Sequence, residues 1–393
     1  MITGKVKSIY SWFALIFFNA LVLFVALNIA IVVASLFRNI FASADPVSTK
    51  YGESKLAAVY PGKSHEVIQD LLRETWSRPY LYEPFTEFKE RPYRGNYVNV
   101  DEHGFRFSKN QASWPPDPMV FNIFVFGGSK TFGYGVSDVE TIPSRLQEIL
   151  RQTLGKPVSI FNFGRGYYYS TQERILFERL LAEGRIPTLA VFIDGVNDFY
   201  LAGIDHAFAQ ARAIEAPSEP SLKTELEALT LKLPLARVAA RLRSWGDCFG
   251  GCAETGEDKT SELASFDDPQ IISNTIARYV SNKTMIEALS AFYGVQPIFV
   301  WEPAPTYKYD QKSDLFIGSR YGRHRYSIYG YPAMKAFVDK SPLGKNFLWC
   351  ADIQEGLSKP LYVDQLHYTA EFSQSVASCV AKLIVDRDLV STR

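Results

Sequence analysis

The sequence predicts an α/β protein with a parallel sheet covered by helices on both faces, preceded by a transmembrane helix. In the central part of the 393-residue chain, apolar runs of strand length alternate with single helical patterns. Strands joined by single helices form a parallel sheet, because each crossover helix packs back onto the sheet. In such sheets ligands bind beyond the carboxyl ends of the strands, so functional residues are expected there.

Each expected strand is a short apolar run, and each expected helix has an apolar side. The first strand covers 122–126, and the helix after it, 140–154, places Ile142, Leu146 and Leu150 on one side. Further strands are expected at 158–162, 189–193 and 296–301, and further helices at about 171–183, 271–292 and 370–386.

The chain divides into three parts by composition. Residues 1–44 are expected to form an N-terminal tail and membrane anchor, and residues 118–393 the α/β domain. Between them, residues 45–117 are rich in Pro, Tyr and charge, and they predict a juxtamembrane segment with short strands near 97–100 and 104–107.

The apolar run over residues 12–37 predicts a membrane span. As a helix it would be roughly 39 Å long, more than the ~30 Å hydrocarbon core of a bilayer, so it can cross with some tilt. Lys5 and Lys7 precede it, which favours a cytoplasmic N-terminus and an exported α/β domain. Arg38 and Lys50 follow the run and weaken that orientation signal.

A cleaved signal peptide is the alternative for this run, because Ala-Ser-Ala at 42–44 has the small-x-small form of a cleavage site. The run is well beyond the ~7–15 apolar residues of a signal peptide, which favours a retained anchor. Within it, Ala26, Ala30 and Ala34 recur every four residues and share one helix face. Such a face permits close packing against a membrane partner, although alanines also simply fill lipid-facing helices.

The charge balance argues against nucleic acid as a partner. The chain has 42 basic and 42 acidic residues and a formal net charge of zero, so no electrostatic footprint for a polyanion is expected. No His, Asp or Glu cluster at ligand spacing accompanies the candidate nucleophile described below. Neither a metal nor another cofactor is therefore expected.

Four cysteines fit an oxidising compartment. Cys248 and Cys252 lie in an insertion of helix and loop near 203–268, and the two glycines between them would let a local disulfide close. Zinc is the other use of paired cysteines, but no nearby His or second pair completes a four-ligand set. Cys350 and Cys379 either pair or remain buried thiols, and the sequence leaves both readings open.

A candidate nucleophile follows the first expected strand. Gly127 and Gly128 permit a tight strand-to-helix turn that lifts the hydroxyl of Ser129 clear of the sheet. Near the C-terminus, Asp364 and His367 are spaced so that the carboxylate can turn back onto its own histidine. A serine hydroxyl becomes an effective nucleophile when a base removes its proton, and a third group must orient that base.

Acyl transfer also needs fixed hydrogen-bond donors for the oxyanion. Polar and glycine residues follow the second and third expected strands, where such donors belong. The side-chain amide of Asn197 could supply one donor, with backbone N–H groups of Ser129 and of residues 164–167 supplying the others.

Four segments resemble, in order, the signature blocks of SGNH (GDSL-like) hydrolases. They are Phe-Gly-Gly-Ser-Lys-Thr-Phe-Gly-Tyr-Gly at 126–135, Asn-Phe-Gly-Arg-Gly at 162–166, Gly-Val-Asn-Asp at 195–198 and Asp-Gln-Leu-His at 364–367. The resemblance covers about residues 97–385 and implies a flavodoxin-like three-layer α/β/α domain. It also implies Ser129 as nucleophile, His367 as base, Asp364 as orienting acid and Asn197 as an oxyanion donor.

Two positions depart from the family pattern. Gly128 stands where the family motif often has Asp. In the second block the donor glycine lies about five residues after the Asn, which is Tyr167 here, with Gly166 one step away. A backbone N–H can donate whatever the side chain, so Gly166 and Tyr167 join Ser129 and Asn197 as candidates for the oxyanion hole.

The resemblance implies an esterase or carbohydrate deacylase on the exported side of a membrane. An O-acyltransferase would use the same acyl-enzyme, with a sugar hydroxyl replacing water. From another class, the chain could be a structural subunit of a membrane complex that keeps the fold; the intact candidate residues argue against that. Glu302 also follows a strand and is expected to lie away from the substrate. Four histidines lack partners in any motif and are expected to be structural or surface residues: His65, His103, His206 and His324.

Residues 304–345 form a Tyr-, Gly- and basic-rich stretch without clear periodicity, and it precedes the candidate Asp and His. Tyrosine offers a flat apolar face and a hydroxyl, which suits stacking on a sugar. We therefore expect a glycan or small polar ester over a long-chain lipid, the alternative being that these tyrosines pack the loop onto its own domain. The residues concerned are Tyr307, Tyr309, Tyr321, Tyr326, Tyr329, Tyr331, Lys308, Arg320, Arg323 and Arg325, with Tyr167, Tyr168 and Tyr169 approaching the same mouth.

Overall fold

A computed structural model describes residues 2–41, 52–76, 78, 80–203, 265–316, 322–387 and 389. The chain separates into two compact units, one containing Met1–Ser43 and the other containing Ala44–Ala213 and Lys259–Arg393. The cysteine pair of the insertion, Cys248 and Cys252, lies outside the described residues.

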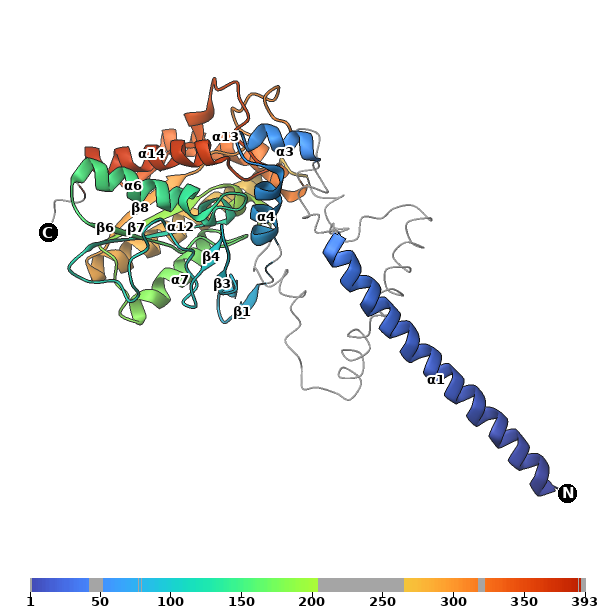
Figure 1. Cartoon of the computed structure of the whole chain (residues 1–393). Coiled ribbons are helices and arrows are strands. Elements are labelled where there is room, and N and C mark those ends of the chain that lie inside the picture. The colour runs from blue at the N-terminus through green and yellow to red at the C-terminus, as the bar shows by residue number, and fades with distance from the viewer. Residues whose placement is uncertain are drawn as a thin grey trace. The chain divides into compact units, whose positions relative to one another are not determined.

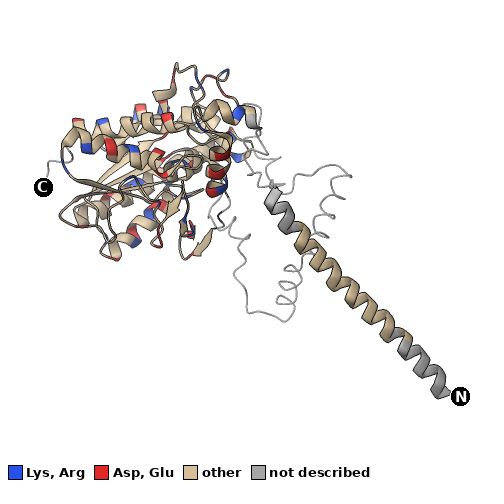
Figure 2. Cartoon of the chain, in the orientation of Figure 1, with Lys and Arg blue, Asp and Glu red and all other residues tan. Residues whose placement is uncertain are grey.

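In the first unit, helix α1 runs from Ile2 to Phe41. Its stretch Ala14–Ala34 is 21 residues long with a mean hydropathy of 2.7, and no Lys, Arg, Asp or Glu interrupts the described tan part of this helix (Figure 2). The helix is therefore long and apolar enough to cross a membrane. A retained anchor and a signal sequence share this property, so both readings stay compatible with it.

The second unit is built on a five-stranded sheet in which all neighbouring strands are parallel (Figure 1). Its spatial order is β6-β5-β7-β8-β9. Counted along the chain within this sheet, that is 2-1-3-4-5, the doubly wound order of flavodoxin-like folds. The predicted fold class is thus confirmed. The strands are β5 (Phe121–Gly127), β6 (Val158–Asn162), β7 (Leu189–Asp194), β8 (Gln296–Trp301) and β9 (Phe347–Trp349).

Helices cover both faces of this sheet because the strand side chains alternate between two apolar clusters. Along β5, Ile123 and Val125 join the cluster beneath α6 (Ile142–Leu154) and α14 (Ala370–Asp386). Phe124 and Phe126 point the other way, into the cluster beneath α7 (Ser170–Ala182) and α12 (Pro269–Tyr293).

The stretch before the sheet is part of the α/β unit rather than a bare linker. Here the N-terminal segment means residues 52–100. The apolar side of its helix α4, formed by Ile68, Leu71 and Leu72, shares a buried cluster with Phe132 and Val363 next to the candidate catalytic residues. Its elements are α3 (Glu53–Val59), α4 (His65–Trp76), β1 (Leu81–Glu83), β2 (Glu87–Lys89), β3 (Tyr93–Arg94) and β4 (Asn99–Val100).

Two expectations about elements were wrong. The stretch 104–107 is no strand: only Arg106 forms isolated bridges, to Val100 and Asn162. Residues 304–345 do contain regular structure, because helix α13 runs from Tyr326 to Lys340 with Pro332 inside it. Short helices complete the unit: α5 (Ser129–Phe132), η1 (Asp138–Glu140), α8 (Val196–Tyr200), η2 (Gly322–Arg325) and η3 (Ala351–Gln354).

Candidate active site

Three of the predicted residues meet at the carboxyl end of the sheet. Ser129 is the first residue of α5, directly after β5. Its Oγ lies 2.9 Å from Nε2 of His367, whose Nδ1 lies 2.7 Å from Oδ2 of Asp364. The other carboxylate oxygen of Asp364 accepts the N–H groups of Leu366 and His367, each at 2.8 Å. We call Ser129, His367 and Asp364 the triad.

The turn that presents Ser129 leaves no room for side chains at the two residues before it. A Cβ on Gly127, whose φ is 157°, would lie 2.1 Å from Oγ1 of Thr131. A Cβ on Gly128 would lie 2.3 Å from Nδ2 of Asn197. The Asn197 amide thus occupies the space that a side chain at position 128 would need.

The orienting carboxylate is held in its charged form. Burial alone would raise the pKa of Asp364, but the charge of His367 and the hydrogen bonds from His367 and Leu366 outweigh it and lower the pKa. A charged Asp364 favours the His367 tautomer with a proton on Nδ1, which leaves Nε2 free to accept a proton from Ser129.

The candidate oxyanion donors differ in availability. The N–H of Gly166 donates to Oε1 of Glu90 at 3.1 Å, so it is already engaged. Tyr167 has a φ of 61°, a left-handed conformation typical of glycine, and within the described residues its N–H donates to no acceptor. Asn197 donates one amide hydrogen to the carbonyl of Tyr168 at 2.7 Å, which fixes the plane of its amide beside Gly128.

A buried ion pair adjoins the nucleophile. Lys130 Nζ lies 2.9 Å from Oε1 of Glu302 and donates to the carbonyl of Pro303 at 2.9 Å. The two side chains are only 2% and 6% exposed. Burial lowers the pKa of Lys130 and raises that of Glu302, each opposed by the partner's charge. Glu302 thus joins β8 to helix α5, which begins at Ser129.

Two aromatic rings enclose His367, and neither contact was expected from the sequence. Tyr134 stacks on His367 with ring centroids 5.4 Å apart and an interplanar angle of 22°. Trp76, at the end of α4, meets the His367 ring edge-on at 5.4 Å and Tyr134 at 4.9 Å. The apolar spacing of α4 was a readable signal for its helix, but nothing in the sequence pairs that helix with His367.

The other histidines differ in how close they lie to the site. His324 was expected to be structural, yet it lies close enough to the site that the charges of Lys130 and His367 act on it. Burial first, then these charges, lowers the pKa of His324 to about 3, so the ring is neutral at pH 7. It packs on Tyr200 with centroids 4.5 Å apart. His103 hydrogen-bonds Asp101 on the surface, and His206 lies outside the described residues.

The tyrosines of residues 304–345 mostly do not form an open aromatic mouth. Those that pack into apolar clusters of their own domain are Tyr307, Tyr309, Tyr326 and Tyr331. Tyr329 is 45% exposed, and Tyr321 and Arg320 lie outside the described residues. Near the triad, Tyr168 and Tyr169 are buried, whereas Tyr167 is 45% exposed and faces Tyr200 at 6.0 Å between ring centroids.

Buried acidic side chains lie in and next to the third signature block, residues 195–198. Burial first, then the charge of neighbouring acids, raises the pKa of Glu173 and of Asp194 well above the usual range. Asp198, next to Asn197 in the chain, accepts a hydrogen bond from the Ser170 hydroxyl at 2.6 Å. Among the described residues no group of three or more His, Cys, Asp or Glu is arranged to hold a metal ion.

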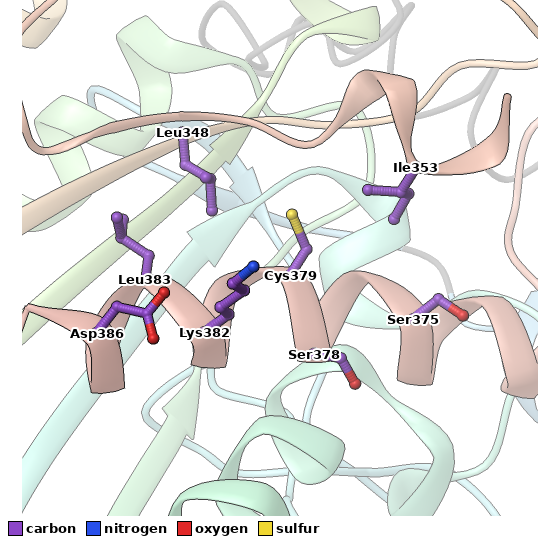
Figure 3. A pocket seen from close by; sticks show the side chains of 8 residues that line it. All are labelled: Leu348, Ile353, Ser375, Ser378, Cys379, Lys382, Leu383 and Asp386. Atoms are coloured by element: carbon purple, nitrogen blue, oxygen red, sulfur yellow. The ribbon is translucent and has the colours of Figure 1, made fainter.

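Cys350 and Cys379 form a disulfide that joins the end of β9 to α14. Beside it lies a surface hollow, in which side chains of α14 face Leu348 and Ile353 (Figure 3). No triad residue lines this hollow. Its lining residues are Leu348, Ile353, Ser375, Ser378, Cys379, Lys382, Leu383 and Asp386.

Comparison with known proteins gives likeness in fold only. No family model matches the chain, and no curated protein matches it. A G-D-S-L family protein from Desulfitobacterium hafniense aligns with 67% of this chain and 99% of its own, at 11% identity and a TM-score of 0.34. A carbohydrate acetylesterase family member from Sinorhizobium meliloti aligns with 69% and 99%, at 14% identity and a TM-score of 0.36. A psychrotrophic esterase from Pseudoalteromonas aligns with 68% and 98%, at 12% identity and a TM-score of 0.35.

Proposed function

From the premise that this chain has an SGNH-like hydrolase fold, we propose that it is a serine esterase that forms an acyl-enzyme on Ser129. The observation that carries the proposal is the hydrogen-bonded relay from Ser129 to His367 to Asp364. Strand order and this relay, rather than the weak overall likeness to solved structures, support the assignment.

In the first half-reaction, Nε2 of His367 takes the proton of Ser129 while Oγ forms a bond to the ester carbonyl carbon. The tetrahedral intermediate collapses, the bond to the alcohol oxygen breaks, and His367 returns the proton to that oxygen. Water then attacks the acyl-enzyme, again losing a proton to His367, and the acid leaves as Ser129 regains its proton. Asp364 stabilises the imidazolium that forms twice in each turnover.

The oxyanion would be held by donors on three different loops. The N–H of Ser129 lies at the start of α5, where helix N–H groups have no partner within the helix. The amide of Asn197 and the N–H of Tyr167 would complete the set. Gly166 is the weaker of the two candidates in its loop because Glu90 already accepts its N–H.

The exported side of a membrane is the proposed location. Lys5 and Lys7 before the span favour a cytoplasmic N-terminus. The Cys350–Cys379 disulfide supports the same placement, since disulfides persist mainly in oxidising compartments. The span would keep the esterase tethered to the membrane surface if it is retained.

For substrate we propose an ester of a polar, ring-bearing alcohol such as an acylated sugar. The support is the exposed ring of Tyr167 beside Tyr200 at the candidate oxyanion loop, because most of the tyrosines of residues 304–345 are buried. A ring with a hydroxyl can stack on a sugar and hydrogen-bond its edge. Higher kcat/KM on long-chain esters than on acetylated oligosaccharides would contradict this choice.

A fluorophosphonate probe tests the catalytic proposal directly. The full chain in detergent should label once, and peptide mapping should place the label on Ser129. Ser129→Ala should keep the unfolding transition of the wild type but lose both labelling and turnover of a short-chain nitrophenyl ester. Labelling of the Ala variant, or a label on another residue, would overturn the proposal.

A further inference from the structure

The carboxylate of Glu90 connects the N-terminal segment to two parts of the active site. Oε1 accepts the N–H of Gly166 at 3.1 Å and the hydroxyl of Tyr134 at 3.0 Å. The side chain is 1% exposed, so these bonds are made without competition from water. The hydrogen bond to Gly166 joins residues 76 positions apart in the chain.

Arg78 pairs with this buried carboxylate and fixes its position. Its Nη1 donates to Oε2 of Glu90 at 3.0 Å, and its own side chain is 2% exposed. The rest of the guanidinium donates to the carbonyls of Glu74 and Thr75 at the end of α4. The pair is therefore rigidly attached to a helix whose Trp76 touches the ring of His367.

Gly166, whose N–H donates to Glu90, immediately precedes Tyr167, a candidate oxyanion donor. The N–H of Gly166 and the N–H of Tyr167 belong to consecutive peptide groups, so fixing the first restrains the position of the second. Tyr167 itself has a φ of 61°. This left-handed conformation is uncommon for a residue with a side chain and persists where the surroundings enforce it. A Cβ at Gly166 would lie 2.0 Å from the hydroxyl of Tyr80, which further restricts the loop.

The hydroxyl contact acts on the base as well. Tyr134, which donates to Glu90, also hydrogen-bonds Tyr80 at 2.8 Å between hydroxyl oxygens. The ring of Tyr134 stacks on one face of the His367 imidazole. By holding the hydroxyl of Tyr134, the carboxylate of Glu90 therefore also restrains the imidazole. One acceptor group thus orients both the oxyanion loop, residues 164–167, and the base.

We propose that Glu90 is a positioning residue for acyl transfer, which holds the N–H of Tyr167 toward the oxyanion by accepting the neighbouring N–H of Gly166. This inference rests on the proposed esterase function. It assigns the N-terminal segment, expected from sequence to be part of a juxtamembrane segment with short strands, a direct part in the catalytic geometry. The acceptor oxygen of Glu90, rather than its charge, makes the contact with the loop.

Two double variants separate the acceptor from the ion pair. Arg78→Met with Glu90→Gln removes both charges but keeps an amide oxygen that can accept from Gly166. Arg78→Met with Glu90→Met has similar volume and no acceptor. Replacing a buried ion pair by neutral side chains of similar size is often tolerated, so both should fold.

The measurement is kcat per active site, titrated by the end point of fluorophosphonate labelling, on a short-chain nitrophenyl ester. The Met/Met variant should have a kcat about ten-fold below that of the Met/Gln variant, less than the 10²–10³-fold loss of a whole oxyanion donor. KM should agree within two-fold, because the substrate is bound before the oxyanion forms. Counting labelled sites removes any unfolded fraction from the comparison.

Glu74→Gln is the matched control. Glu74 is a buried carboxylate of the same segment that accepts the N–H groups of Asn96, Tyr97 and Val98, away from the triad. It should lose stability and keep kcat per labelled site. Equal kcat in the two double variants, or a ten-fold loss in Glu74→Gln, would overturn the role of Glu90. Absence of labelling in the wild type would instead overturn the esterase proposal itself.

Discussion

The indole of Trp76 meets the imidazole of His367 edge-on, with ring centroids 5.4 Å apart, although 291 positions separate them in the chain. Trp76 ends helix α4 of the N-terminal segment, and His367 belongs to the last signature block. His367 is thus enclosed between a residue of the segment that precedes the sheet and Tyr134, which lies six positions after Gly128. One of these two ring contacts, that of Trp76, comes from outside all four signature blocks.

Trp76→Ala should lower kcat per labelled site by about ten-fold. The His367 ring would lose one of its two aromatic contacts, each worth about 0.5–1.5 kcal/mol beyond burial, and would spend less time aligned with Ser129. Trp114→Ala is the control, because Trp114 packs among Phe105, Phe124 and Phe161. It should lose stability while keeping kcat per labelled site; an equal kcat loss in both variants would remove the special role of Trp76.

Asn197→Ala should lower kcat by roughly 10²–10³-fold with little change in KM, the scale for losing one oxyanion donor. The loss is expected because the amide lies against Gly128, and the tetrahedral oxyanion forms beside Ser129. Asn282→Ala is a suitable control, since Asn282 also donates from a buried amide, to Ser170 and Thr171. A wild-type rate for Asn197→Ala would exclude this side chain from the oxyanion hole.

The positions of the strands could be predicted from local patterns, and the candidate triad from those patterns together with the family resemblance. The expected runs 158–162 and 296–301 coincide with β6 and β8, since continuous apolar runs mark strands buried on both faces. The carboxyl ends of parallel strands meet at one edge, so Ser129 and Asn197 had to be neighbours.

The rest depended on contacts that no short pattern encodes. Glu90 resembles any other charged residue of its segment, and its role is visible only once Gly166 lies beside it. Helix α13 escaped notice because Gly330 and Pro332 are poor helix formers, and its tyrosines suit a loop or cleft equally well. In α13, the burial of Tyr326 and Tyr331 in the tertiary structure favours the helix over a loop.

The stability conferred by Glu83 should vanish in acid. Burial alone would raise the pKa of this carboxyl, but the charges of Arg165 and Arg179 outweigh it and lower the pKa from 4.5 to about 2. A depressed pKa contributes stability above pH 4.5 that is lost as the pH falls toward 2. Each pKa unit is worth about 1.36 kcal/mol, so the loss is on the order of 3 kcal/mol at most.

Urea unfolding of the wild type and of Glu83→Gln at several pH values measures this contribution. Their difference in unfolding free energy should be largest near neutral pH and should shrink between pH 4.5 and 2. Taking the difference cancels the titration of other carboxyls, such as Glu87, whose pKa burial raises to about 7. A gap that is independent of pH would show that Glu83 is not held charged by Arg165 and Arg179.

Reduction of the Cys350–Cys379 disulfide should destabilise the α/β unit. The bond closes a loop over a sequence separation of 29, for which chain entropy gives roughly 3–4 kcal/mol. Urea unfolding with and without reductant measures the loss, and Cys350→Ala combined with Cys379→Ala should match the reduced protein and no longer respond to reductant. Alkylation of Cys350 and Cys379, located by peptide mapping in protein purified without reductant, would contradict both the bond and the exported location.

The alanine face of α1 should mediate association within the membrane. Ala26, Ala30 and Ala34 lie on one side of the helix and are exposed along it, and small residues permit the close backbone approach on which membrane helices rely. Asn28 already donates to the carbonyl of Phe24 at 2.8 Å within its own helix, so packing at this face is expected to depend on the alanines. Replacing all three by Leu should weaken self-association or co-purification of a membrane partner. Replacing Leu21 by Ile and Val25 and Val32 by Leu, on the opposite side of the helix, keeps the apolar length and serves as the control. If both triple variants associate as the wild type does, the alanines only fill a lipid-facing helix.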